Sequence, residues 1–586
     1  MAKKSTTYQP VPPEIEELAV KNGKDPEALL ELLKELQEKP GGLSSKNIAA
    51  AARSMGLPAS KVHGMATFYS MLSSQPRENI LRVCDGPVCW LARAAMDGHS
   101  PKNNDSRSMV SEWKNEIDVP GWSIERSSCL GLCDSAPAVL VNHDQVGPVS
   151  PKDASKVCAG WRGVPTHYIE PRKGELRVML DNIGKIDPDS IDSALKFGAY
   201  DGLKAALRMK SDEVLAEVSA SGLQGRGGAG FPTGAKWDFC RKAKGTPKYV
   251  ICNADESEPL IFKDRVLIDT NPHRILEGMA IGGYACGANE AWIYIRGEYE
   301  TQALRLEQAI LQAEENGFLG KNILDSKYSF KIHVHRGAGA YICGEETALI
   351  ESLEGRRGEP RLRPPYPPTY GFRGRPTIVN NVETFAAVAH ILSHGADWWR
   401  GLASYSVPGV KLYMLLGHVQ NPGLFEAPFG LTLRQVIDDF GGGMPPGSKF
   451  KCALTGGAAG TIVDSHLLDV PMDYASSKAG ISIGAGAFLV CDQRVSVPAL
   501  LRELLHFFSV ESCGKCVPCR AGSERAFEIL TAMTQGKGRI GNVDELKALS
   551  QNLMAASFCG LGQAISIPID SALKNFTGEF AIAEER

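Results

Sequence analysis

The sequence has no long apolar run, no marked excess of either charge and no export signal, and each absence removes a class of function. Its 64 lysines and arginines almost balance 67 aspartates and glutamates, so the net charge is -3 and nucleic acid is not an expected partner. The longest apolar candidate, residues 275–295, is interrupted by Glu277, Asn289 and Glu290, whereas a membrane span needs about 20 apolar residues. The N-terminus lacks the apolar stretch of a signal peptide. We therefore expect a cytoplasmic protein without direct membrane insertion, or one that is peripheral to a membrane through its partners.

Cysteine, by contrast, is plentiful, and its spacing indicates metal binding. Without an export signal, short clustered spacings favour metal ligands over disulfides. One quartet has three thiols separated by two residues and a distant fourth, which suits a [4Fe–4S] cubane: Cys513, Cys516, Cys519 and Cys559. A second quartet suits a [2Fe–2S] rhomb: Cys84, Cys89, Cys129 and Cys133.

Two alternatives stay open for these quartets. Zinc is the main rival of the cubane, because paired cysteines also bind zinc, and zinc or unrelated thiols compete at the second quartet. The remaining seven cysteines are interpreted as buried free thiols: Cys158, Cys240, Cys252, Cys286, Cys343, Cys452 and Cys491.

The length of 586 residues predicts three to five domains. Helical spacing predicts a helix over 14–37 and shorter helices over 44–55 and 58–71, followed by strands at 79–84, 122–125 and 138–142. Both cysteine pairs of the second quartet should then lie just after strands or in loops. Periodicity is lost around 164–191, which predicts a linker containing Pro165, Pro171 and Pro188. Helical spacing resumes at 190–208, strands are expected near 248–252, 291–296 and 330–336, short strands dominate 411–490, and the remainder from 497 is helical.

A glycine-rich stretch contains a literal G-x-G-x-x-G. It reads Gly225-Arg-Gly-Gly-Ala-Gly-Phe-Pro-Thr-Gly-Ala-Lys236. A Rossmann loop is disfavoured because residues 214–218 look helical and Pro232 should disturb the helix that would follow. Glycines this close together let backbone N–H groups approach a phosphate in any fold. The plainer alternative is a tight surface turn.

Four further motifs add polar and aromatic groups. The stretch Asn253-Ala-Asp-Glu-Ser-Glu-Pro259 follows a predicted strand, and its acids suit hydrogen bonds to a flavin edge, a ribose or an amide, although a solvated turn is the alternative. A second glycine-rich turn, 336–347, carries paired carboxylates. Residues 364–367 stiffen Tyr366 with prolines, and the amides of 380–381 sit at an expected helix start. Together these motifs fit both a flavin and a nicotinamide nucleotide.

These motifs, with the cysteine stretch Glu511-Ser-Cys-Gly-Lys-Cys-Val-Pro-Cys-Arg-Ala-Gly522, resemble the NADH-oxidising module of respiratory complex I and its relatives. The C-terminal part resembles the FMN- and NADH-binding subunit, here fused behind its thioredoxin-like [2Fe–2S] partner, as in diaphorase subunits of NAD-linked formate dehydrogenases and NAD-reducing hydrogenases. The resemblance implies an α/β multidomain fold with N-terminal helices, a thioredoxin-like domain, a non-Rossmann FMN and NADH domain, a β-grasp-like domain and a C-terminal helical bundle. The N-terminal helices are expected at 13–74 and the thioredoxin-like domain at 79–163, followed by a linker at 164–190. The FMN and NADH domain is expected at 191–400, the β-grasp-like domain at 408–492 and the helical bundle at 495–586.

The resemblance also implies roles for individual residues. The FMN phosphate and ribityl chain would lie against Gly225, Arg226, Gly227, Gly228 and Lys236. The rest of the flavin would lie against Asn253, Asp255, Glu256, Ser257, Gly344, Asn380, Asn381 and Thr384. The NADH side would be formed by Phe231, Phe239, Glu258, Tyr341, Glu345, Glu346 and Tyr366, with Glu258 and Glu346 as the catalytic carboxylates.

The implied activity is that of an NADH dehydrogenase, or diaphorase, that exchanges electrons between NAD(H), FMN and the clusters and a partner redox subunit. That partner would be a formate dehydrogenase, a hydrogenase or a complex I arm, with no nucleic acid involved. The alternatives are a subunit of an electron-bifurcating complex and a non-catalytic scaffold that bears clusters.

One departure from the family pattern concerns the turn after Pro259. The family has glycine there, whereas this chain has Leu260-Ile261. Because leucine adopts positive φ only with strain, the turn is expected to differ and the contacts of Glu258 to be less secure.

Overall fold

The computed structural model describes residues 10–73, 78–96, 108–117, 120–163, 166–403 and 405–585. The expected boundary at Ser74 and the start of the expected linker, including Pro165, lie outside this part. None of the helices in the described ranges combines the length and apolar character that a membrane crossing requires.

Four short helices open the chain: α1 (Pro13–Lys21), α2 (Leu29–Gln37), α3 (Ser45–Ser54) and α4 (Ala59–Ala66). The prediction of one helix over 14–37 is wrong, because the backbone turns at Gly23 and Lys24, with φ of 65° and 51°. Beyond α4 the chain contacts the domain that contains α15 (Glu346–Leu353), where the Tyr69 hydroxyl lies 2.7 Å from the Ser352 hydroxyl.

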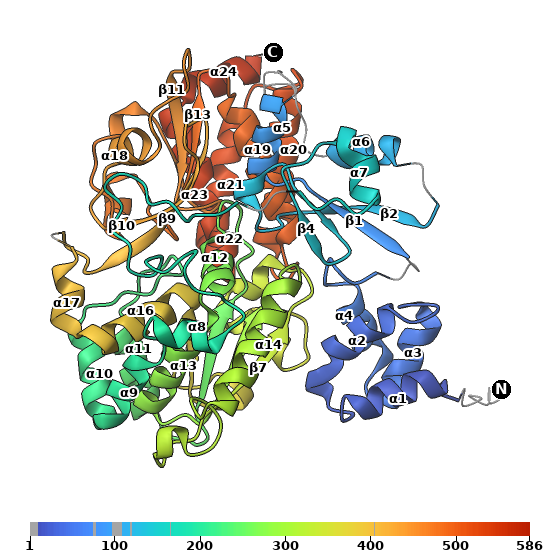
Figure 1. The fold of residues 1–586 in the computed structure, drawn as a ribbon. Coiled ribbons are helices and arrows are strands. Elements are labelled where there is room, and N and C mark those ends of the chain that lie inside the picture. The colour runs from blue at the N-terminus through green and yellow to red at the C-terminus, as the bar shows by residue number, and fades with distance from the viewer. Residues whose placement is uncertain are drawn as a thin grey trace.

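The first sheet has the order β2-β1-β3-β4, with β1 and β2 parallel and the other pairs antiparallel. Its elements are β1 (Asn79–Cys84), α5 (Pro87–Met96), α6 (Ser108–Glu116), β2 (Trp122–Ser127), β3 (Val139–Val141), β4 (Asp144–Val146) and α7 (Ala154–Cys158). Cys89 lies on α5 and not in a loop as predicted, because Pro87 begins a helix there. α5 lies beside α19 of the C-terminal helices (Figure 1).

Residues 166–190 form neither helix nor strand, yet they are firmly bound. The carboxylate of Glu426 accepts the backbone N–H groups of Val178, Met179 and Leu180 at 2.8, 3.0 and 3.1 Å. Glu426 is fully buried on β10, so this predicted linker is attached to a later domain through a buried carboxylate.

The second sheet is parallel throughout and has the order β7-β6-β5-β8. Its strands are β5 (Tyr249–Ala254), β6 (Glu290–Ile295), β7 (Lys331–Arg336) and β8 (Thr377–Asn381), of which β8 was not predicted. The helices around it are α8 (Ile191–Lys196), α9 (Asp201–Arg208), α10 (Ser211–Ala220), α11 (Thr233–Lys242), α12 (Lys263–Thr270), α13 (Pro272–Cys286), α14 (Glu300–Glu315), α15 (Glu346–Leu353), α16 (Val382–His394) and α17 (Ala396–Gly401). The carboxyl ends of parallel strands are where α/β sheets form ligand sites.

The third sheet has the order β10-β9-β13-β11-β12, in which only β9 and β13 are parallel. Its elements are β9 (Val410–Gly417), β10 (Gly423–Pro428), α18 (Leu433–Gln435), β11 (Phe450–Thr455), β12 (Thr461–Val463) and β13 (Ala487–Asp492). The chain ends in α19 (Val497–Glu511), α20 (Val517–Thr534), α21 (Asn542–Ala556), α22 (Gly560–Ala564), α23 (Ser566–Asn575) and α24 (Thr577–Glu585). The multidomain α/β fold is thus as predicted.

Replacing Glu426 with alanine tests the attachment of residues 166–190. The change leaves three backbone N–H groups without their acceptor, so we expect E426A to lower stability by about 3 kcal/mol. Limited proteolysis should then cleave within 166–190, and the melting temperature should fall. The control E170A alters an exposed glutamate of the same segment. Equal protection in both variants would contradict the attachment.

Candidate active site

The glycine-rich loop lies between two helices, α10 and α11, and not between a strand and a helix. Gly228 and Gly230 have φ of 121° and 66°, which a side chain would strain. The prediction that Pro232 disturbs the next helix is wrong: Pro232 caps α11, which begins at Thr233. Proline is well suited to a helix start because a missing N–H costs little there. The loop is therefore not a Rossmann loop.

This loop forms one wall of a cavity of roughly 480 Å³ at the carboxyl ends of β5 and β8. Eleven of the predicted site residues line it: Gly227, Gly228, Asn253, Asp255, Glu256, Ser257, Glu258, Tyr341, Gly344, Glu345 and Asn381. Three groups were missed by sequence reasoning: Lys263 and Asp264 of α12; Gly456, Ala459, Gly460, Ser482, Gly484 and Ala485 of the third-sheet domain; and Gly560, Leu561 and Ala564 of α22. No local pattern marks the last two groups, because only tertiary contact brings them to the cavity.

The polar groups of the cavity fit a flavin. Asp255 is buried, its Oδ2 has no hydrogen-bond partner, and burial raises its pKa well above the usual range. Such an atom lacks the hydrogen bond that a buried polar group requires, and an imide-like N–H of a ligand would supply it. Asn253 is oriented by its bond to the Gly344 carbonyl, at 2.8 Å. Together with the amides of the glycine loop, these groups match the polar edge and the phosphate of FMN.

Lys263 is a buried cation at the floor of the cavity. Its Nζ lies 2.6 Å from Asp264 Oδ1, 3.0 Å from Asn381 Oδ1 and 3.0 Å from Glu383 Oε2. Burial lowers its pKa, but Asp264 and Glu383 outweigh this and raise it above the ordinary value. Lys263 is therefore charged and fixes Asn381, a predicted flavin contact, in one orientation.

Glu258 connects the cavity to the third-sheet domain. Its Oε1 accepts the backbone N–H of Ala459 at 3.0 Å. Gly457 makes room for this contact, because a Cβ there would lie 2.5 Å from the same oxygen. Burial raises the pKa of Glu258 to about 7. At neutral pH this carboxyl therefore exchanges readily between its two protonation states.

Besides Lys236, which lies on the rim described next, four predicted FMN contacts do not line the cavity. The Arg226 guanidinium is buried and donates to the carbonyls of Gln224, Pro408 and Val410, while its backbone N–H donates to Thr384 Oγ1 at 2.9 Å. The Asn380 side chain accepts from the Trp237 indole at 2.9 Å. Gly225, Arg226, Asn380 and Thr384 thus support the loop and strand from behind, and their direct contact with FMN stays a prediction.

The predicted NADH residue Glu346 lies on a charged rim beside the cavity, whereas Phe231, Phe239 and Tyr366 are exposed aromatic residues outside it. Glu346 lies 3.5 Å from Lys236 and 3.6 Å from Arg363. Arg363 also lies 3.4 Å from Glu345, a cavity residue, and 5.9 Å from the ring centre of Tyr366. The aromatic rings are about half exposed, at 47% for Phe231, 53% for Phe239 and 54% for Tyr366. Exposed rings beside a charged rim are suited to stacking on a nucleotide.

The C-terminal quartet lines one small cavity together with Ile342, Pro360, Lys515 and Leu561. Backbone N–H groups of Leu561 and Gly562 hydrogen bond to the Cys559 thiol, and that of Lys515 to the Cys513 thiol. Such donors favour thiolates, which are the ligands of iron–sulfur clusters. Ile342 and Leu561 line the larger cavity as well, so a single layer of side chains separates it from this quartet.

The N-terminal quartet also gathers in one place. The Sγ atoms of Cys129 and Cys133 lie 3.8 Å apart, Cys84 contacts Cys129 and Cys89, and the Gly131 N–H donates to Cys129 Sγ at 3.5 Å. The other seven cysteines are free, and all but the half-buried Cys158 are buried.

Leu260 adopts the conformation that glycine would favour. Its φ is 81° and its side chain is completely buried. Leucine thus does not prevent a left-handed residue in this turn, which accepts the strain, and a difference from the family's turn stays a prediction. The same turn donates the Leu260 N–H to the Cys133 thiol, so it lies between the cavity and the N-terminal quartet.

Two substitutions measure this strain. Because glycine carries no penalty at positive φ, L260G should be about 1 kcal/mol more stable than L260A. Leu267, which is also buried but lies inside α12, provides the control. At this helical position L267A should be more stable than L267G. Melting temperatures rank the four variants, and L260A melting above L260G would contradict the strain.

Four family models match the chain in the order of these domains. They are the thioredoxin-like [2Fe–2S] ferredoxin at 15–162, the Nuo51 FMN-binding domain at 218–390, the SLBB domain at 412–461 and the NADH-ubiquinone oxidoreductase-F iron–sulfur binding region at 499–583. The iron–sulfur descriptions decide against zinc for the two quartets.

Relatives of known type and a solved structure agree. The F 2 subunit of NADH-quinone oxidoreductase from Rhizobium meliloti (strain 1021) is 45% identical over 412 residues, which are 70% of this chain and 98% of that protein. The HndC subunit of the NADP-reducing hydrogenase from Solidesulfovibrio fructosivorans is 47% identical over 409 residues, 70% of this chain and 83% of the relative. A chain of an NAD+-reducing [NiFe]-hydrogenase crystal structure, in the air-oxidized state, superposes with a TM-score of 0.81 at 29% identity and covers 96% of this chain and 94% of its own length. The protein thus belongs to the family of NADH-quinone oxidoreductase F subunits, as an NADH-oxidising enzyme subunit with an FMN-binding domain and two iron–sulfur regions.

Proposed function

We propose that this chain exchanges electrons between NAD(H) and a partner redox subunit, with NAD(H) bound on the charged rim, FMN in the 480 Å³ cavity and electrons leaving through the C-terminal quartet. The observation that carries this proposal is the shared wall: Ile342 and Leu561 line both the cavity and the cysteine quartet. When bound, FMN supplies the conversion between two-electron hydride transfer and one-electron transfer to clusters. The clusters would be held by Cys513, Cys516, Cys519 and Cys559, and by Cys84, Cys89, Cys129 and Cys133.

The chain's own residues bind, orient and exclude water. Gly227 and Gly228 bring backbone N–H groups to the phosphate side, while Asp255 and Asn253 orient the polar edge of the ring. Glu258 and Glu346 hold the nucleotide as the predicted catalytic carboxylates. Tyr341, half-buried against Phe507 with ring centres 5.0 Å apart, closes the cavity toward the C-terminal helices. The protein thus tunes and positions its cofactors, which carry the redox chemistry.

The domain content favours an NAD-linked formate dehydrogenase or hydrogenase complex in the cytoplasm over a membrane-bound complex I arm. The solved hydrogenase chain covers 96% of this chain, including its N-terminal domain, whereas the NADH-quinone oxidoreductase F 2 subunit covers 70%, as does the hydrogenase subunit HndC. Metal analysis of the complex purified through this chain tests the assignment. Stoichiometric molybdenum or tungsten indicates a formate-type partner and nickel a hydrogenase, whereas iron alone together with quinone reduction would contradict both.

The pKa of Glu258 predicts how NADH binding depends on pH. The carboxylate gains its charge as pH rises through about 7, and only the ionised form accepts hydrogen bonds from the nucleotide with both oxygens. The KM for NADH should therefore fall roughly fivefold between pH 6 and pH 8. In E258Q this slope should vanish, while E351Q, a change on α15 away from the cavity, should keep it. A slope that persists in E258Q would assign the titration to another group.

Replacing Cys516 with serine tests the exit route. Because the quartet lies beyond the cavity wall, C516S should lose one cluster signal in electron paramagnetic resonance and at least about 90% of electron delivery to the partner, by loss of one of four ligands. NADH should still bleach the flavin absorbance at the parent rate. C158S, at a half-buried free thiol, should behave as the parent. Loss of flavin bleaching in C516S would contradict the position of this cluster downstream of the flavin in the electron path.

A further inference from the structure

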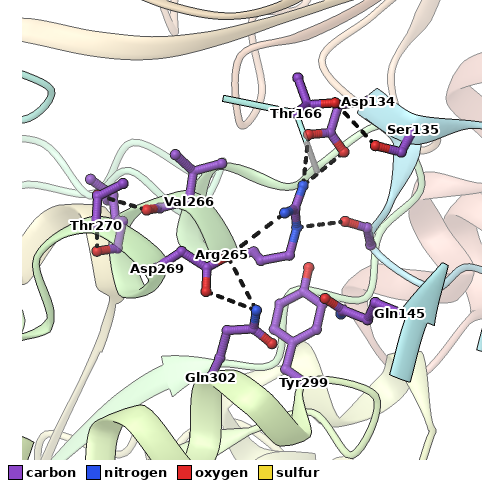
Figure 2. A network of polar contacts seen from close by, with 12 residues as sticks. Asp134, Ser135, Gln145, Thr166, Arg265, Val266, Asp269, Thr270, Tyr299 and Gln302 are labelled. Atoms are coloured by element: carbon purple, nitrogen blue, oxygen red, sulfur yellow. Dashed lines mark hydrogen bonds and ion pairs between the residues drawn. The ribbon is translucent and has the colours of Figure 1, made fainter. Parts of the chain in front are cut away.

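Arg265 of α12 contacts residues of both sites assigned above. Figure 2 shows its guanidinium beside Asp134, Asp269 and Tyr299. Its backbone N–H donates to Glu256 Oε2, a wall of the cavity, at 3.0 Å. Its guanidinium donates from Nε to the Gly131 carbonyl at 3.2 Å and from Nη2 to both carboxylate oxygens of Asp134 at 2.7 Å each. Gly131 and Asp134 belong to the ligand loop, residues 129–134, which carries two cysteines of the N-terminal quartet.

Two neighbouring side chains repeat this pattern. The Tyr299 hydroxyl donates to Glu256 Oε2 at 3.0 Å. The same hydroxyl lies against Gly131, because a Cβ on that glycine would come within 2.1 Å of the Tyr299 hydroxyl oxygen. Arg296 donates from one nitrogen to the Glu256 carbonyl and from another to the Cys129 carbonyl. Glu256 is therefore held by three residues that each also contact the ligand loop.

These contacts are buried, which makes them strong and directional. The side chain of Asp134 is 1% exposed and that of Arg265 11%. Asp134 also accepts the Tyr168 hydroxyl at 2.7 Å. Forked guanidinium–carboxylate pairs add geometric specificity to their charge, and buried charges are little screened by salt. The ligand loop therefore cannot move relative to Glu256 without breaking charged hydrogen bonds.

We infer that Arg265 is a positioning residue that sets the reduction potential of the N-terminal cluster, and that Tyr299 couples that potential to the flavin cleft through Glu256. The inference rests on the proposed assignment of Cys84, Cys89, Cys129 and Cys133 as [2Fe–2S] ligands. One-electron reduction adds negative charge beside the guanidinium, so the positive charge of Arg265 favours the reduced cluster. Glu256, bonded to the same residue, opposes it. Because coupling between two sites is reciprocal, the redox state of the cluster also affects the ionisation of Glu256 in the cleft.

The first test is a potentiometric titration of the [2Fe–2S] signal by electron paramagnetic resonance, in the full chain loaded with FMN and iron. R265Q should make the reduction at least tenfold less favourable, a shift of about 59 mV for one electron. The matched control is R305Q, which removes an equal charge from the cavity that Arg265 also lines. Arg305 directs its hydrogen bonds to Asp189 and Asp269, not to the ligand loop, so its shift should be less than threefold.

The second test is a double-mutant cycle on the same potential, run at pH 9 so that Glu256, whose pKa burial raises to about 8, is ionised in the parent. E256Q should make reduction more favourable in the parent and have less than half that effect in Y299F, which removes the hydroxyl that joins Glu256 Oε2 to the ligand loop. Combined with R305K, the effects should add, as they do for uncoupled sites.

Equal shifts in R265Q and R305Q, or a full E256Q effect in Y299F, would overturn the inference. Absence of any [2Fe–2S] signal from the iron-loaded parent would instead overturn the ligand assignment, and the coupling with it. A normal signal with additive cycles would leave the assignment standing and remove the coupling alone.

Discussion

The buried ion pair between Lys263 and Glu383 holds the cavity in shape. Both side chains are almost fully buried, and their charged atoms lie 3.0 Å apart. Burying an ion costs several kcal/mol unless a partner and hydrogen bonds offset it. Here the offset comes from Asp264 and Asn381 around the lysine and from the Leu412 N–H on the glutamate, at 3.0 Å. Because these residues lie on α12, α16, β8 and β9, the pair fixes the parallel sheet and the SLBB domain in one relative position.

The cavity therefore has walls from segments that are far apart along the chain. The turn at Gly457 approaches the distant Glu258, and α22 brings Leu561 between the cavity and the cysteine quartet. Glycines at these contacts let backbone groups come close enough to act as walls and donors. The result is a site enclosed by three domains, in which a flavin can be shielded from water while electrons cross a single layer of side chains.

How far the sequence predicts this arrangement depends on whether the information is local. The gathering of the cysteines was predictable because thiol spacing is itself the chemical requirement of a cluster, and the strand-end acids were predictable because they follow an apolar run. Arg226 was not: its motif places it in a phosphate loop, but packing against Pro408 and Val410 turns its guanidinium inward. Leu260 shows the opposite limit, since propensity forbids the positive φ that surrounding contacts impose. Sequence analysis missed Lys263 and the turn at Gly457, because only the folded chain brings them to the cavity.

Polar contacts join the N-terminal domains to the rest beside a shared apolar core, and covalent fusion gives this a consequence. Besides the bonds of Arg265 and Arg296, they include Arg373 with Glu27 and His335 with Glu31, each at 2.7 Å. Between separate proteins, polar interfaces of this kind are typical of transient association. A tether replaces encounter from solution by an effective concentration in the millimolar range. The fused chain can thus keep its two electron carriers in register through these contacts without tight intermolecular binding, whereas a version split into two polypeptides would have to maintain the same contacts by affinity at cellular concentrations.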